Sequence, residues 1–290
     1  MTCDVDFATP VVQATIARGK LAVAPCIGTD QMGPKRFGKA GKLAFSFGNV
    51  AQDEGSAMAQ YAIKRGWKTA GLATNTLLVY FKNVVQAFDK RYRQLGGKVV
   101  TRESYATGAN NVNTAVSRLN SHKAAVYVTS TAFGELPAFV SGLRSLHNNT
   151  PILNSWAGDG TYWAPSSPKV TNYYFVTYAS VFGDDPSVAV RKMIAALKAA
   201  GATPGTGGFL GGADAIDGVF LAIKRAHGSL KGSALAAQLE KFKGQAVLGG
   251  KISFSAKLHT VFGRQYRVMK IQNNKATYVG PITAKVIPNL

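Results

Sequence analysis

The regular alternation of apolar strands and amphipathic helices between residues 67 and 178 constrains the fold more than any other feature of the sequence. Short apolar segments typical of buried strands alternate there with longer segments whose apolar residues recur at helical spacing. The expected strands are KTAGLAT, KVVTRE, AAVYVT, PILN and YYFVTY, and the expected helices lie near 79–95, 110–120 and 136–146. Because this order requires crossover connections, it predicts an α/β fold with parallel sheets flanked by helices.

The flanking segments extend this pattern. LAVAP and LAFSF are expected strands, with helices near 7–18 and 53–65. After Asp185 three helices are expected near 187–200, 209–227 and 233–243, followed by antiparallel strands at KISFS, QYRVMKIQ and KATYVG. Asn273 and Asn274 favour a hairpin between the last two. A parallel block, a helical block and a β tail predict a chain that crosses between two lobes more than once.

The charge of the chain is strongly positive, because 34 Lys and Arg residues stand against 14 Asp and Glu, for a formal net charge of +20. The basic residues are spread over expected helix ends and loops, without a zinc-finger, basic-zipper or ribonucleoprotein motif beside them. A solvated basic surface is therefore favoured, and no nucleic-acid partner is expected. No apolar run reaches the ~20 residues of a membrane span. The first residues, MTCDVDFATP, lack the plan of a secretory signal, so the protein is either cytosolic or exported by a signal missing from this chain.

Motifs of catalysis and metal binding are missing from the sequence. Cys3, Cys26 and four dispersed histidines form no CxxC, HExxH or paired-ligand spacing, which argues against a metal site. The glycine cluster GTGGFLGG at 205–212 follows no apolar strand and lacks a phosphate-loop lysine, so a helix-to-helix linker is expected. No GxSxG nucleophile elbow is present. We therefore expect no metal, no cofactor and no enzymatic activity.

Polar and aromatic residues recur where the expected strands end. In open parallel sheets, ligands bind beyond the carboxyl ends of the strands. Hydroxyls, amides and aromatic rings at these corners suit a small molecule, held by hydrogen bonds to its polar end and by ring contacts to its body. The candidate ligand-binding residues at the corners are Thr29, Thr74, Tyr80, Ser130, Trp156, Asp159 and Phe182.

Most of these residues also have a purely structural interpretation. Ser, Thr, Asn and Asp cap helices wherever helices begin, and Tyr80 with Phe81 could simply pack the first turn of a helix. Asp159 precedes Gly160, which suits a plain turn as well as a ligand contact. Trp156 is more informative, because the small residues around it in SWAGDG offer its ring little local core.

The order of the segments resembles the type I periplasmic solute-binding proteins of ABC transporters, the branched-chain amino acid-binding family. The likeness rests on GWKTAGLATNTLLVYFKNVVQAF, LGGKVVTRESYATGANNVNTAVSRL, AAVYVTSTAFGELPAFVSGLRSL and PILNSWAGDG. ADAIDGVFLAIKRA is similar to a family helix with a Tyr–Asp–Ala–Val motif, with Asp217 kept and Ile216 in place of the tyrosine. GGKISFSAKLHTVFGRQYRVMKIQNNKATYVG is similar to the closing segment. The likeness covers nearly the whole chain, and although each motif is loose, their order is specific.

This resemblance implies two α/β lobes joined by three crossovers, with a ligand held in the cleft between them. It assigns residues 1–50 and 186–248 to the first lobe and residues 51–185 and 249–290 to the second. Family members begin with further strand–helix units, so CDVDFATPVVQ would be the end of a third strand and its helix. The expected fold is therefore a two-lobe type I fold whose first lobe is incomplete, in a chain that is a fragment.

The same resemblance implies roles for single residues. Tyr80 would face the cleft, Thr29 would bind the polar end of the ligand, and Phe182 would form an aromatic wall. Asp4 replaces a family serine, and its carboxylate would repel a carboxylate on a ligand. The mapping also places Cys3 and Cys26 at the ends of neighbouring strands, about 4.8 Å apart, where either a disulfide or two buried thiols would fit.

The function implied by the resemblance is that of a non-enzymatic, substrate-binding component of an ABC-type importer, periplasmic when complete. It would capture a small organic solute, such as an amino acid or an aromatic or other organic acid, and deliver it to a membrane permease. A ligand-sensing regulator of the same superfamily, responding to an amide or amino acid, is the alternative and would lack an export signal. An enzyme on a similar sheet is a third hypothesis, which the missing catalytic groups disfavour.

Overall fold

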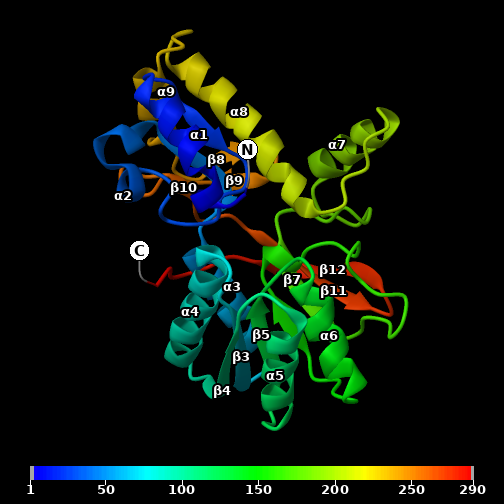
Figure 1. Cartoon of the computed structure of the whole chain (residues 1–290). Helices are drawn as coiled ribbons and strands as arrows, with labels where there is room; N and C mark the ends of the chain where they lie inside the picture. Colours follow the sequence, from blue (N-terminus) through cyan, green and yellow to red (C-terminus); the bar gives the residue numbers. More distant parts are fainter. Residues whose placement is uncertain (1–2, 289–290) are drawn as a thin grey trace.

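Two sheets organise the molecule. The computed structural model describes residues 3–288, and Figure 1 shows an upper and a lower half. The lower half contains a seven-stranded sheet in the order β12-β11-β7-β6-β5-β3-β4. The upper half contains a three-stranded sheet, β1-β2-β10, and a two-stranded ribbon, β8-β9.

The larger sheet is built mainly from the alternating segment of the sequence. Its parallel strands are β3 (Thr69–Asn75), β4 (Lys98–Tyr105), β5 (Val126–Ser130), β6 (Ile152–Asn154) and β7 (Tyr173–Thr177). Its helices are α3 (Ala51–Lys64), α4 (Val79–Gln94), α5 (Ala109–Asn120) and α6 (Glu135–Ser145). One apolar core contains side chains of α3 and α4, and a second contains side chains of α5 and α6. Helices thus cover both faces, as parallel sheets require, and the predicted α/β fold is confirmed.

An antiparallel pair of strands forms one edge of this sheet. Strand β11 (Tyr266–Gln272) pairs with β7 and with β12 (Lys275–Ile282), both in antiparallel orientation. Asn273 and Asn274 connect β11 to β12 with φ angles of 52° and 63°. Asparagine tolerates positive φ better than most residues, and a two-residue hairpin turn needs it at both positions. The predicted hairpin is confirmed.

The smaller sheet has parallel strands β1 (Ala22–Ala24), β2 (Ala44–Asn49) and β10 (Thr260–Val261). Helix α1 (Val5–Ala17) shares an apolar core with Ala22 and Ala24. Helices α8 (Leu210–Arg225) and α9 (Gly232–Leu239) share another with Phe45 and Phe47. The short helix α2 (Pro34–Phe37) and the 3-10 helix η1 (Gly38–Leu43) lead into β2.

Helix α1 begins earlier than the family likeness implied. The expected strand at CDVDF is not formed by its described residues, because α1 starts at Val5. Asp4 is the N-cap of this helix, and its Oδ1 accepts hydrogen bonds from the backbone N–H groups of Asp6 (2.8 Å) and Phe7 (3.1 Å). An aspartate N-cap satisfies donors that a helix start leaves unpaired, and here it ends any extended segment at Asp4.

The segment after β7 connects the two halves. It contains α7 (Val188–Ala199), the 3-10 helix η3 (Gly207–Phe209), α8 and α9, and then the ribbon of β8 (Gln245–Val247) and β9 (Gly250–Ile252). The glycine cluster at 205–212 links α7 to α8 through η3, as predicted. Helix α7 buries Val190 and Ile194 in the core that also holds α3 and α4.

The chain passes between the two sheets at three places: between β2 and α3, between β7 and α8, and between β10 and β11. The predicted division into lobes stays a proposal, which these pairings refine. Because β10 pairs with β2, we propose that the last crossing lies after Val261 and not at residue 249. Because α7 packs into the larger half, we propose that residues 186–199 belong there as well.

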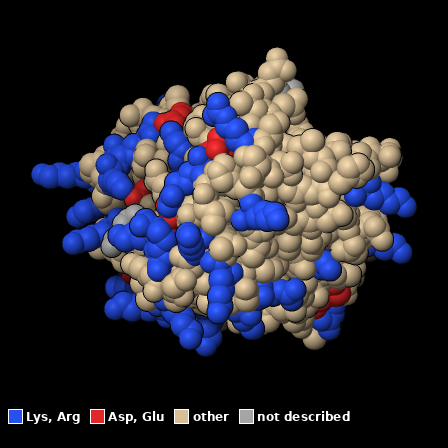
Figure 2. Space-filling model, turned by 90° about the horizontal axis from the view of Figure 1, so that it is seen from below, with Lys and Arg blue, Asp and Glu red and all other residues tan. Residues whose placement is uncertain are grey.

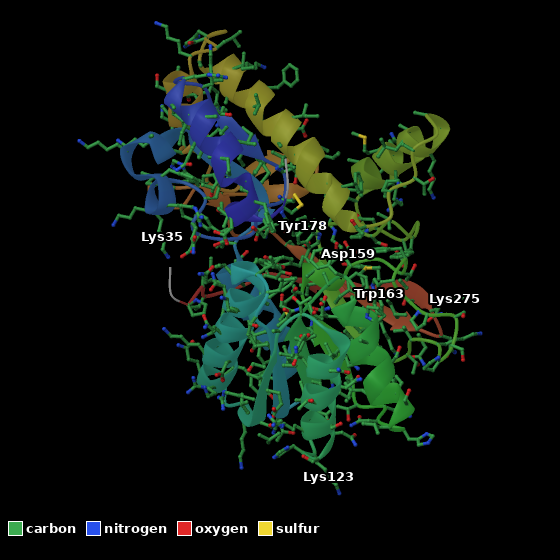
Figure 3. All side chains as sticks on the ribbon, in the orientation of Figure 1. Lys35, Lys123, Asp159, Trp163, Tyr178 and Lys275 are labelled. Atoms are coloured by element: carbon green, nitrogen blue, oxygen red, sulfur yellow. A yellow bond between two sulfur atoms is a disulfide. The ribbon has the colours of Figure 1, made fainter. Side chains whose placement is uncertain are left out.

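A buried polar cluster lies at the junction of the two halves. The Arg264 side chain is fully buried and donates to Asn49 Oδ1 (2.7 Å), to the Phe47 carbonyl (3.2 Å) and to the Asp214 carboxylate. Its guanidinium carbon lies 4.9 Å from the centre of the Tyr178 ring. Figure 3 places Tyr178 and Asp159 at this junction. The cluster therefore joins β2, α8 and the segment before β11 through one buried cation.

Many basic residues lie on the face of the molecule that Figure 2 shows. Figure 2 shows Lys and Arg spread over one face, with few acidic residues among them. Several lie in the last turns of helices, including Lys64, Arg93 and Arg118, where a positive charge complements the helix dipole. This distribution agrees with the expected solvated basic surface. Within residues 3–288, no helix has both the length and the apolar character needed to cross a membrane.

Candidate ligand-binding site

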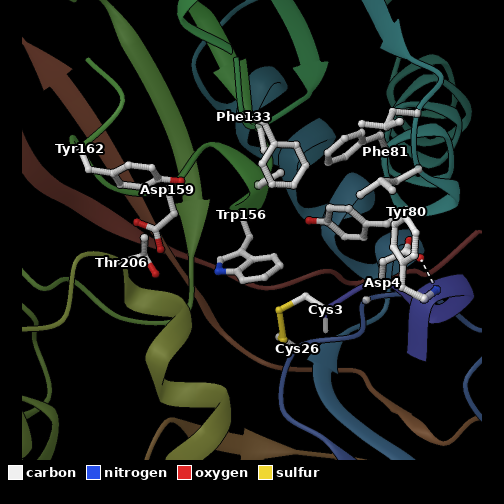
Figure 4. A pocket seen from close by; sticks show the side chains of 16 residues that line it. Cys3, Asp4, Cys26, Tyr80, Phe81, Phe133, Trp156, Asp159, Tyr162 and Thr206 are labelled. Carbon is white, nitrogen blue, oxygen red and sulfur yellow. Dashed lines mark hydrogen bonds between the residues drawn. A yellow bond between two sulfur atoms is a disulfide. The ribbon is translucent and has the colours of Figure 1, made fainter. Parts of the chain in front are cut away.

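A cavity of about 560 Å³ lies where the corners of the larger sheet face the smaller half (Figure 4). Its lining comes from α1, the corner after β1, the corners after β3, β5 and β6, and the segment before η3. Six aromatic rings contribute to the wall: Phe7, Tyr80, Phe81, Phe133, Trp156 and Tyr162. Such a cavity has the size and the apolar walls of a small-molecule site.

Tyr80 stands in the first turn of α4, and its ring is held on two sides. Its hydroxyl donates to Glu54 Oε2 across 2.7 Å. The edge of the ring lies against Gly28, where a Cβ atom would come within 2.7 Å of Tyr80 Cδ2. Glycine at position 28 is thus required by close approach, and it lets a ring from the larger half touch the corner after β1.

Trp156 is the first residue of η2 (Trp156–Gly158), which follows β6 after Ser155, and it lines the cavity. Its ring stacks on Tyr178 with centroids 5.4 Å apart, and its edge-to-face contact with Tyr80 spans 6.2 Å. Its backbone N–H donates to Glu54 Oε1. Among the described residues, the buried Nε1 has no hydrogen-bond partner. This indole N–H is a donor that a ligand could use.

Asp159 is buried beside Trp156 and connects the cavity wall to the smaller half. Its Oδ2 accepts from the Thr177 hydroxyl and from the backbone N–H of Gly207 at 2.7 Å, whereas Oδ1 has no partner among the described residues. Burial raises the pKa of Asp159 from 3.8 to about 7, although the hydrogen bonds from Thr177 and Gly207 oppose the rise. Asp159 is therefore more than a turn residue, and it offers the cavity an acceptor near neutral pH.

Asp4 and a disulfide form the side of the cavity nearest α1. Cys3 and Cys26 are bonded to each other, with Cα atoms 4.8 Å apart, and both line the cavity with Asp4. Of the two alternatives, the disulfide is confirmed and the pair of buried thiols is wrong. The bridge fixes the start of α1 against the corner after β1, and so holds Asp4 and Phe7 at the cavity.

Four candidate residues lie outside the cavity lining. Thr29 is buried, and its carbonyl accepts from the Thr260 hydroxyl at 2.7 Å. The Ser130 hydroxyl bonds to the Ser155 hydroxyl at 2.7 Å. Thr74 is half-buried on β3, and Phe182 is 37% exposed. A ligand-binding role for these four residues stays a prediction, whereas Asp4, Tyr80, Trp156 and Asp159 share one cavity.

The other residues of the predicted corners mainly hold the corners together. Asn75 Oδ1 accepts from Leu77 N at 2.9 Å, and Asn75 Nδ2 donates to Thr131 Oγ1 at 2.9 Å. Asn154 Oδ1 similarly accepts from Thr131 N at 3.1 Å. These amides join neighbouring corners, so their role is structural.

Among the described residues, the cavity lining contains the carboxyl groups of Asp4 and Asp159 and no Lys, Arg or His side chain. Polar contacts to a ligand would come from these carboxyls, from hydroxyls of Tyr162 and Thr206, and from the indole of Trp156. No group of three or more His, Cys, Asp and Glu side chains within the described part of the chain could hold a metal ion. The arrangement suits binding of a small molecule with a large apolar body.

Sequence reasoning missed several members of the site. Phe7 had no signal, because it reads as one apolar residue of a helix. Phe133 and Tyr162 are aromatics of the corners after β5 and β6, so the rule that identified Tyr80 and Trp156 could have found them. Glu54 carried no signal at all, since an acidic residue in the first turn of a helix is usually exposed.

Comparison with known proteins identifies the class. A sequence model of the family described as "Periplasmic binding protein" matches residues 6–276. No curated protein matches the chain in sequence. The structure is similar to a leucine-binding protein, LivK, of Thermotoga maritima, with a TM-score of 0.80 and 18% identity over 95% of this chain and 77% of that one.

Two further solved structures share this likeness. One is the branched-chain amino acid transporter substrate-binding protein LivJ of Streptococcus pneumoniae in complex with isoleucine, with a TM-score of 0.77 and 20% identity over 95% of this chain and 77% of that one. The other is an ABC-transporter solute-binding protein of R. palustris in complex with benzoate, with a TM-score of 0.77 and 19% identity over 97% and 76%. These similarities establish a shared fold, and with the family match they show that the chain belongs to the periplasmic binding protein family.

Proposed function

We propose that this chain is the solute-binding component of an ABC-type importer and acts by binding, without catalysis. The observation that carries the proposal is the cavity of about 560 Å³ lined by both halves of the molecule and walled by six aromatic rings. Because the lining comes from both halves, movement of one half against the other would open and close the cavity. A membrane permease of the transporter would then receive the solute.

The ligand class follows from the lining of the cavity. Aromatic walls suit an aromatic ring or a branched aliphatic body. Asp159 Oδ1 and Trp156 Nε1 supply an unused acceptor and an unused donor for the polar end. An amino acid offers both a donor and an acceptor, whereas an aromatic acid offers acceptors only and would pair with the indole N–H and with the protonated form of Asp159. Isoleucine and benzoate are the solutes named for two of the similar structures.

Location outside the cytosol is part of the proposal. The bond between Cys3 and Cys26 would persist in an oxidising compartment such as the periplasm, whereas cytosolic thiols are usually kept reduced. This favours an exported transport receptor over a cytosolic sensor of the same fold.

Isothermal titration calorimetry with L-leucine, L-isoleucine and benzoate tests the proposal. We expect one-to-one binding of at least one of these solutes. Trp156→Ala should weaken it by about 1 to 3 kcal/mol, because the ring is an anchor in a largely desolvated wall. Trp163→Phe is the matched control, since Trp163 packs against Tyr173 and does not line the cavity. Absence of binding by the folded protein to every solute in a wider panel of amino acids and organic acids would refute the proposal.

A further inference from the structure

Glu54 bonds to two residues that line the cavity, Tyr80 through its hydroxyl and Trp156 through its backbone N–H, without lining the cavity itself. It lies in α3, is fully buried, and has one carboxyl oxygen on the Tyr80 hydroxyl and the other on the Trp156 backbone N–H. These two partners are 26 and 102 residues away from Glu54 in the sequence. One carboxyl group thus ties together the first turn of α4 and the start of η2.

The rings of Tyr80 and Trp156 each lie close to a glycine, Gly28 and Gly208 respectively. A Cβ at Gly28 would meet the Tyr80 ring at 2.7 Å, and a Cβ at Gly208 would meet Trp156 Nε1 at 2.4 Å. Space beside both rings is therefore limited. The carboxyl thus holds the Tyr80 hydroxyl and the Trp156 backbone, while the two glycines limit the space beside the rings.

We propose that Glu54 is a positioning residue that holds Tyr80 and Trp156 as one rigid aromatic corner and thereby sets which ligand shapes the cavity accepts. This inference rests on the proposed binding function. It assigns Glu54 no contact with the ligand: the effect passes through the two rings. Binding sites keep their geometry when the residues that touch the ligand are themselves locked by such supporting hydrogen bonds.

The protonation state of Glu54 supports this assignment. Burial raises the pKa of Glu54 from 4.5 to about 8, the bonds from Trp156 and Tyr80 lower it, and the nearby charges of Asp53 and Asp159 raise it further. The carboxyl is thus mostly neutral at pH 7. The other titratable groups facing it are Tyr178 and Tyr266, whose own pKa values lie far above this range.

A neutral Glu54 can serve both partners in only one way. A backbone N–H can only donate, so Oε1 accepts from Trp156 and the acid proton lies on Oε2, which donates it to the Tyr80 oxygen. Once Glu54 ionises, the Tyr80 hydroxyl donates to Oε2 instead. Glutamine can reproduce this arrangement, with its carbonyl towards Trp156 and its amide towards Tyr80. Alanine can reproduce neither bond.

Fluorine NMR of the full chain labelled with 5-fluorotryptophan tests the positioning without any ligand. Trp156→Phe assigns the resonance of residue 156. In the wild type this resonance should shift with a midpoint near pH 8, and Glu54→Gln should abolish that step while keeping the low-pH position. The pKa values of Asp159 and Asp53 are both raised to about 7, so Asp159→Asn and Asp53→Asn should each remove only their own contribution near pH 7 and leave the step near pH 8. Asp53→Asn is the matched control, because Asp53 is a buried neighbour bonded to Asn49 and Tyr266 and not to the rings. The step near pH 8 should persist in this variant.

Binding of L-isoleucine and benzoate to the same variants tests the consequence. Glu54→Ala should weaken binding of either probe by about tenfold, and Glu54→Gln should restore it to within about threefold at pH 7. The proposal is overturned if the fluorine resonance of residue 156 changes neither with pH nor in Glu54→Gln. It is also overturned if folded Glu54→Ala binds the probes with the affinity of the wild type. If Glu54→Ala does not fold, Glu54→Gln and the titration decide. If the wild type binds no solute, the proposed function fails, whereas the fluorine titration still tests the positioning.

Discussion

Removal of the Asp214 carboxylate should destabilise the protein strongly, because it leaves a cation alone in the junction. Arg264 and Asp214 are both fully buried, and Arg264 Nη1 donates to Asp214 Oδ2. Asp214 Oδ1 also accepts from Gly249 N at 2.7 Å. Breaking a buried ion pair from one side costs about 3 to 5 kcal/mol, since the remaining charge has lost its solvent and its partner. We expect a loss of that size in the free energy of unfolding of Asp214→Ala.

Urea unfolding followed by circular dichroism measures this loss, with the disulfide kept intact and the m-value compared between variants. Asp6→Asn is the control, because Asp6 pairs with Arg36 at the surface, where its side chain is 55% exposed, and such pairs contribute about 0 to 1 kcal/mol. The double variant Asp214→Leu with Arg264→Met should be more stable than Asp214→Ala, since it leaves no buried charge. A loss below about 1 kcal/mol for Asp214→Ala, or a double variant less stable than the single one, would refute the reasoning.

Three further predictions concern other parts of the site. Gly28→Ala should weaken isoleucine or benzoate binding in calorimetry, because its methyl group would displace the Tyr80 ring; binding equal to that of the wild type would contradict the close approach. Reduction of the Cys3–Cys26 bridge should cost about 3 kcal/mol in urea unfolding, since it closes a loop with a sequence separation of 23, and a midpoint unaffected by reductant would count against this. Between pH 5 and pH 9, the free energy of unfolding of Glu54→Gln should rise by about 4 kcal/mol relative to that of the wild type. The pKa of Glu54 is raised to about 8, so the stability that the wild-type acid contributes is fully present below pH 4.5 and is lost as the pH rises through about 8. Free energies of unfolding that change in parallel with pH in the two proteins would contradict this prediction.

The sequence predicted the elements whose signals are local. Strands β3 to β7 are apolar runs between helical segments, and the Asn273–Asn274 turn has residues that tolerate positive φ. Strand β10 was missed because it has only two residues and pairs with β2, more than 200 residues away. Its pattern carries no sign of that partner, which is why the predicted crossing at residue 249 differs from the one that we propose after Val261.

The residues of the site also fall into those that have a local signal in the sequence and those that have none. Tyr80 and Trp156 were predictable, because corners of a parallel sheet converge at one edge. Thr29 occupies a similar corner, but its backbone bonds to Thr260 of β10, a partner that no local pattern reveals. Glu54 looks like an exposed acid of a helix start, and only the meeting of α3, α4 and η2 buries it. The burial and the partners of such residues depend on how distant elements pack together, so residue patterns could not predict them.

The bond between Asp159 and Gly207 gives α8 a fixed end. Asp159 and Trp156 hold the chain at Gly207 and Gly208, just before α8 begins at Leu210, whereas the far end of the helix packs with the smaller sheet. A helix of 16 residues is roughly 24 Å long at 1.5 Å per residue. If the smaller half rotates about this end of the helix, a rotation of about 10° would carry the last turn about 4 Å while leaving the cavity end in place. To measure closure of the two halves, spectroscopic distance labels should be placed near Arg225, with a label near Leu210 as the stationary reference.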